Sequence, residues 1–176
     1  MSILFVFIAA CSDQGFEKED TAAILNGEEM KYEDIMVQFS VDENREETVI
    51  NYLKQEIVIL EAREMGITVS DEEVEESKKA IFPGSDASER YKMIENKELY
   101  EFYEQQASLL GVSPEEFFEA WEERTYQIQA YVEKYIDAKF GYPDKGEDVD
   151  EWGQKIDDHL DKLLKNYKED GRLIIK

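Results

Sequence analysis

The sequence is poor in cysteine, histidine and basic residues, and each shortage excludes a class of protein. Its 176 residues include one cysteine, Cys11, so the chain cannot close an intramolecular disulfide. The one histidine, His159, makes a His-based metal site or Cys–His catalysis a poor explanation of function. Only 20 Lys and Arg residues stand against 43 Asp and Glu, a net charge of -23. Because phosphate contacts need clustered Lys and Arg, no nucleic acid partner is expected.

The recurrent motifs of enzyme sites are missing as well. There is no glycine-rich phosphate loop, nucleophile elbow or zinc-binding spacing. The acidic run from 144 to 151 lacks the ligand spacing of an EF-hand, which indicates a solvated loop. Glu75–Glu76 and Glu122–Glu123 are pairs typical of charged helix faces. We therefore expect no catalytic residue, no cofactor and no metal.

The N-terminus carries an apolar run, ILFVFIAA from Ile3 to Ala10. It is shorter than the roughly 20 residues that span a bilayer, and it is typical of a signal peptide. The ending Ile8-Ala9-Ala10-Cys11 resembles a bacterial lipobox, although no Lys or Arg precedes it. Lipidation of Cys11 would anchor the chain to the cell membrane, facing outside the cytoplasm. The alternative is a buried N-terminal strand or helix with an incidental cysteine.

These features predict a signal peptide over 1–10, a flexible tether over 11–20 and one helical domain over 21–176. Asn26-Gly27 predicts a β-hairpin, because both residues tolerate the positive φ of a type I′ turn. Ser70 and Glu73, and again Ser113 and Glu116, form capping-box patterns at helix starts. The predicted elements are strands at 22–25 and 28–31, a short helix near 32–39, helices at 43–65, 70–82, 86–110, 113–140 and 151–168, and a strand at 172–176. The last strand is expected to pair with the hairpin.

Several stretches in this order resemble the N-terminal chaperone domain of the SurA and PrsA foldase families. They are AILNGE from Ala23, VINYLKQEIVILEAREMG from Val49, ITVSDEEV from Ile67, LGVSPEEF from Leu110 and LDKLLKNYKEDGRLIIK from Leu160. The resemblance implies a mainly α fold, with a trigger-factor-like helical body and a small hairpin that pairs with the C-terminal strand. Foldase members usually carry a parvulin-type isomerase domain before the last helix. Here about ten residues are left for it, so no prolyl isomerase activity is expected.

The resemblance also implies a site, a cradle between helices where exposed aromatic side chains hold unfolded or extended polypeptides. The candidates are Phe82, Tyr100, Phe102, Tyr103, Phe117, Phe118 and Trp121. The alternative for each is ordinary core packing. Neighbouring helical residues point about 100° apart, so Phe117 and Phe118 are not expected to face one core. His159 is expected at the surface.

Two functions are compatible with this sequence. The first is a membrane-anchored, extracytoplasmic chaperone or holdase that binds non-native exported polypeptides. The second is a structural or adaptor envelope lipoprotein that binds one specific protein partner. Exposed helix faces also allow a homodimer.

Overall fold

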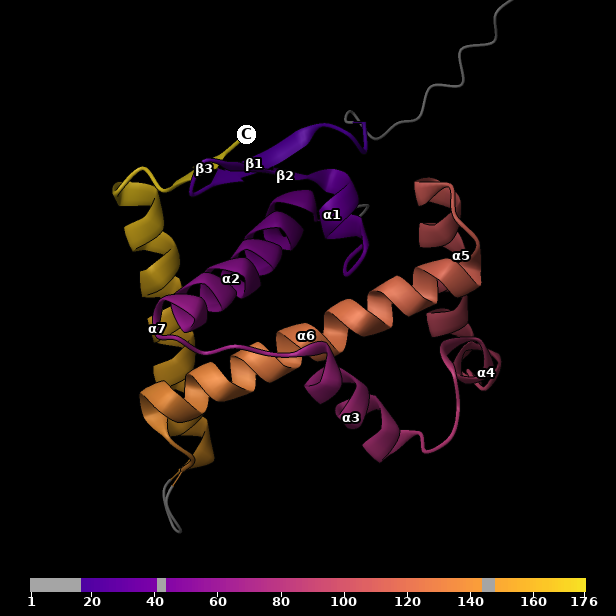
Figure 1. Cartoon of the computed structure of the whole chain (residues 1–176). Coiled ribbons are helices and arrows are strands. Elements are labelled where there is room, and N and C mark those ends of the chain that lie inside the picture. The colour runs from indigo at the N-terminus through magenta and orange to yellow at the C-terminus, as the bar shows by residue number, and fades with distance from the viewer. Residues whose placement is uncertain (1–16, 41–43, 144–147) are drawn as a thin grey trace, which may run out of the picture.

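The computed structural model describes residues 17–40, 44–143 and 148–176 as a mainly helical fold with a small sheet (Figure 1). The elements are β1 (Thr21–Leu25), β2 (Glu28–Lys31), α1 (Tyr32–Met36), α2 (Arg45–Glu64), α3 (Asp71–Ile81), α4 (Ala87–Lys92), α5 (Lys97–Leu110), α6 (Pro114–Phe140), α7 (Val149–Glu169) and β3 (Leu173–Ile175). The predicted fold class is confirmed. The predicted signal peptide, Cys11 and most of the predicted tether lie outside the described residues.

The sheet has the strand order β2-β1-β3, with both pairings antiparallel. Asn26 and Gly27 have φ of 52° and 86°, the positive values that a type I′ turn requires. The predicted pairing of the C-terminal strand with the hairpin is confirmed, since Ile24 lies opposite Ile174. A hairpin alone is marginal in water, and the third strand completes a sheet that can cover a core.

The sheet packs against α1, α2 and the end of α7 to form the main core (Figure 1). Tyr167 is fully buried there; its hydroxyl donates to Glu61 at 2.9 Å, and the Arg172 guanidinium lies 3.7 Å from its ring centroid. Burial raises the pKa of Tyr167. The buried apolar members of this core are Ala22, Ala23, Leu25, Ile35, Met36, Val49, Leu53, Ile57, Leu164 and Leu173.

Helix α6 connects this main core to the other helices. Its second half packs on α2 and α7, where Ile128, Tyr131 and Tyr135 meet Val58 and Ile59. Its first half carries α4 and α5, and α3 packs along its middle (Figure 1). We call the unit formed by α3, α4, α5 and the first half of α6 the arm.

The helix ends follow the predicted caps, with one exception. The capping boxes of Ser70 with Glu73 and of Ser113 with Glu116 are confirmed. The single helix predicted for 86–110 is wrong, because the chain breaks into α4 and α5. Asn96 causes the break: its side-chain oxygen accepts a hydrogen bond from the Leu99 amide at 3.0 Å and starts a new helix. This N-cap is the signal that the sequence interpretation missed.

His159, predicted at the surface without a partner, is partly buried between α6 and α7. Its Nε2 lies 2.7 Å from the Tyr135 hydroxyl, and its ring meets Phe140 edge-on at 5.2 Å between centroids. Burial lowers the pKa of His159 and raises that of Tyr135 to about 12. Glu61 acts on His159 in the opposite sense to burial, and Lys139 and Lys162 act with burial. The lowered pKa favours the neutral imidazole at physiological pH.

We expect this pair to make stability depend on pH. Because the folded pKa of His159 lies below its unfolded value of about 6.5, its contribution is complete above that value and is lost as the pH falls through it. Urea unfolding at pH values between about 7.5 and 5.5 should show a falling free energy of unfolding, at most about 1.4 kcal/mol per unit of pKa shift. His159→Gln should flatten this slope. If the free energy of unfolding of the variant falls with pH as steeply as that of the wild type, other titratable groups cause the pH dependence.

Candidate functional site: an apolar groove in the arm

The arm is held together by a cluster of aromatic rings. Tyr103 of α5 lies at its centre, 1% exposed, with ring centroids at 5.2 Å from Phe118, 5.1 Å from Trp121 and 6.1 Å from Phe117. Tyr91 of α4 contacts the same ring at 6.4 Å. Edge and tilted contacts of this kind add to the burial of large apolar surface. The cluster fixes α4 and α5 on the first half of α6.

The expectation that Phe117 and Phe118 do not share one core is wrong. Phe117 is 1% exposed and Phe118 is 6% exposed, both within the arm cluster. The cluster wraps around α6, and the Tyr103 ring lies close enough to contact both. The two side chains leave α6 in directions about 100° apart, and both directions lead into the same continuous core.

A groove opens beside this cluster, between the end of α3, the α4–α5 link and α6. Its volume is about 420 Å³. The bulky apolar side chains at its mouth include Met93, 63% exposed, and Ile81, 60% exposed. Leu99 and Phe82 are 40% and 39% exposed. Such a concentration of exposed apolar side chains along one hollow is typical of a binding surface.

The structure brings together some of the predicted site residues and separates others. Phe82, Tyr103, Phe118 and Trp121 line the groove. Phe102 and Phe117 pack in the cluster behind it, and Tyr100 stacks on Tyr91 at 5.3 Å on the outer side. The groove residues that the sequence interpretation missed are Ile81, Met93, Ile94 and Leu99. They lie at helix ends and in a link, where no periodic pattern distinguishes them.

The floor of the groove carries a buried ion pair between α4 and α6. Arg90 is 9% exposed and Glu122 is 2% exposed; Arg90 Nε donates to Glu122 Oε1 at 2.6 Å. A second bond joins Nη2 to Oε2, and Nη1 donates to the Ser85 carbonyl. Hydrogen bonding to the Glu122 carboxylate raises the pKa of Arg90 against the opposing effect of burial. The pair is thus bidentate, an arrangement that fixes the direction of both side chains.

Further ion pairs attach α3 to α6. Lys78 of α3 is 5% exposed and donates to Glu75 at 2.9 Å and to Glu123 of α6. Lys134 of α6 pairs with Glu73 at the start of α3 and donates to the Thr68 carbonyl. Helix α3 therefore contributes few apolar residues to the arm and is held mainly by polar contacts. It forms one wall of the groove.

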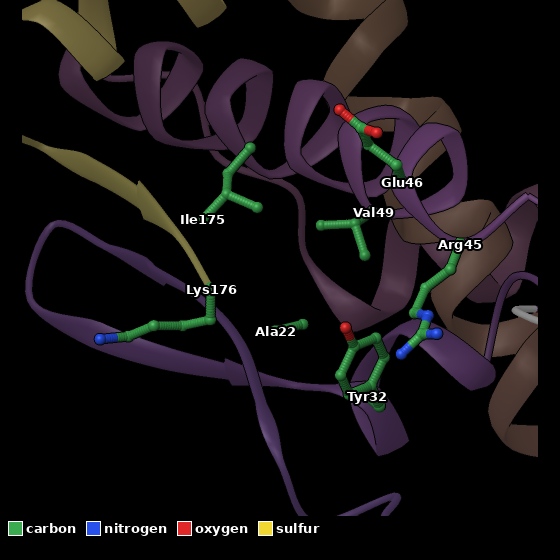
Figure 2. A pocket seen from close by; sticks show the side chains of 7 residues that line it. All are labelled: Ala22, Tyr32, Arg45, Glu46, Val49, Ile175 and Lys176. Carbon is green, nitrogen blue, oxygen red and sulfur yellow. The ribbon is translucent and has the colours of Figure 1, made fainter. Parts of the chain in front are cut away.

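A second hollow of about 310 Å³ lies between the sheet and the start of α2 (Figure 2). Val49 and Ile175 face each other across it, and Ala22 lies on its floor. The Tyr32 hydroxyl points into the space beside Arg45, whereas the Lys176 side chain points away. This hollow has fewer bulky apolar side chains than the arm groove.

Chemically, the arm groove can bury apolar surface. Within residues 17–40, 44–143 and 148–176, no group of three or more His, Cys, Asp and Glu side chains is arranged to hold a metal ion. The same ranges contain no helix that is both long and apolar enough to cross a membrane. Comparisons of the chain with protein-family models, curated proteins and solved structures found no match.

Proposed function

We propose that the chain is an extracytoplasmic, membrane-anchored chaperone-like module that holds non-native polypeptides in the arm groove. The observation that carries the proposal is the groove itself, with Met93 and Ile81 more than half exposed on a chain of net charge -23. A strongly charged protein that leaves bulky apolar side chains on one hollow has a surface suited to apolar partners. The charge elsewhere favours solubility of the loaded complex.

The resemblance to the SurA and PrsA chaperone domain supports the same proposal. It implies a hairpin, a helical body with a cradle between helices, and a C-terminal helix and strand, and elements of these kinds occur in this order. The proposal includes lipidation at Cys11 and location at the outer face of a bacterial cell membrane. It includes neither prolyl isomerase activity nor a cofactor.

The proposal is tested by aggregation of a chemically denatured model protein after dilution. We expect the wild-type chain to suppress light scattering at about equimolar amounts. The double variant Ile81→Gln, Met93→Gln should be about ten-fold less effective, since the loss of two bulky apolar contacts costs at least about 1.4 kcal/mol of binding. Both side chains are exposed, so the variant should keep the wild-type unfolding midpoint.

A matched control is Val112→Gln, Val149→Gln, which changes side chains that are 43% and 64% exposed and lie outside the groove. This control should suppress aggregation like the wild type. If the wild-type chain does not suppress aggregation at any ratio, the proposal is wrong. An adaptor lipoprotein would instead retain one stoichiometric envelope protein and give no general suppression.

A further inference from the structure

The groove contains three charged side chains, and two of them neutralise each other. Arg90 and Glu122 form the bidentate pair on the floor. Glu95 is the third and lies in the α4–α5 link, exposed to solvent. Among the described residues it makes no hydrogen bond or ion pair. The groove therefore presents one uncompensated carboxylate.

The neighbours of Glu95 place this carboxylate within an apolar setting. Met93 and Ile94 precede it, and Leu99 lines the same groove. The side chain of Asn96, the next residue, already caps the start of α5. The nearest lysine on α5, Lys97, pairs with Glu101 at 3.1 Å and does not line the groove. When a peptide buries an apolar side chain against Met93 and Leu99, the side chain beside it in the peptide comes close to the negatively charged Glu95 carboxylate.

We propose that the groove selects extended peptide segments in which a lysine or arginine stands next to bulky apolar residues. The proposal rests on the proposed function and specifies its substrate class. The apolar side chains supply most of the affinity, and the Glu95 carboxylate pairs with the cation. Lysine and arginine suit this place because their aliphatic stems pack on apolar surface while the charged end reaches the rim. The net charge of -23 acts in the same direction, raising association rates of cationic segments and opposing acidic ones.

The experiment uses three fluorescent peptides that share one apolar sequence and differ at a single flanking position: Lys, Gln or Glu. Binding is measured by fluorescence anisotropy at low and at physiological salt. The Lys peptide should bind about three- to five-fold more tightly than the Gln peptide, as expected for one partly screened ion pair. The Glu peptide should bind more weakly than both. The preference should shrink in salt.

Glu95→Gln should abolish the difference between the Lys and Gln peptides. The matched control is Glu98→Gln, an exposed carboxylate of α5 that does not line the groove. It removes the same formal charge, so it should keep the Lys preference. If both variants lose the preference equally, the overall charge of the chain is responsible, and the role of Glu95 is overturned.

The outcomes separate this inference from the proposed function. If all three peptides bind with equal affinity, the groove binds peptides without charge selection, and only the further inference fails. If none binds, the proposed function fails with it. Sedimentation of the chain alone supplies the remaining outcome. A dimer that is lost in Ile81→Gln, Met93→Gln would place a second copy of the chain in the groove and overturn the inference.

Discussion

Glu122→Ala should lower the free energy of unfolding by about 3–5 kcal/mol, the cost of leaving a buried charge without its partner. Arg90 is 9% exposed and is held by two bonds from its guanidinium to Glu122. After the substitution its remaining described partner is the Ser85 carbonyl. The guanidinium must then draw in water or swing outward, which separates α4 from α6 on the floor of the groove. Urea unfolding followed by far-UV circular dichroism measures the loss.

The double variant Arg90→Met, Glu122→Leu is the control for this prediction. It removes both charges and keeps apolar volume, so it should recover most of the stability lost in Glu122→Ala. Recovery would show that the penalty comes from the unpaired charge. A single variant as stable as the wild type would contradict the buried position of the pair.

Tyr103→Ala is the second substitution with a large expected effect. It removes the ring at the centre of the arm cluster, where Tyr103 contacts Tyr91, Phe102, Phe117, Phe118 and Trp121. Replacing a fully buried aromatic residue by alanine costs about 3–5 kcal/mol through lost contacts and a residual cavity. The emission of Trp121, measured with Trp152 replaced by Phe, should follow the unfolding of the arm.

Tyr100→Ala provides the comparison. Tyr100 is 37% exposed and stacks on the outer side of Tyr91. Its loss should cost less than about 1 kcal/mol, as is usual for exposed positions. Tyr103→Phe should also stay close to the wild type, because it keeps the ring. Equal losses for Tyr100→Ala and Tyr103→Ala would contradict the central place of Tyr103.

Local sequence patterns predicted most of the fold because the interactions behind them are local. The Asn26-Gly27 turn, the two Ser–Glu capping boxes and the helical spacing of Val49, Leu53 and Ile57 each depend on a few neighbouring residues. The break between α4 and α5 was missed because the apolar pattern runs on across it. Asn96, the residue that starts α5, resembles any polar residue on a helix face until its side chain is seen to cap the Leu99 amide.

The candidate site could be predicted from the sequence only in part. The groove joins Ile81 and Phe82 to the link at Met93 and to α6, segments distant in the sequence. Its exposed apolar residues carry no special pattern, because the difference between a core side chain and an exposed one is set by what packs against it. The seven predicted site residues are all large aromatic residues, and three of them lie outside the groove lining. Only the tertiary arrangement separates binding surface from core.

The pairing of β3 with β1 has a consequence for the order of folding. Leu25 and Leu173 are partners in the sheet although 147 residues lie between them. Contacts between such distant residues form slowly, whereas turns, caps and helices need only neighbours. During synthesis, β1 must wait for β3 until the residues between Leu25 and Leu173 have been made. We therefore expect the helices to form first, the hairpin to stay marginal, and the sheet to close in the last step.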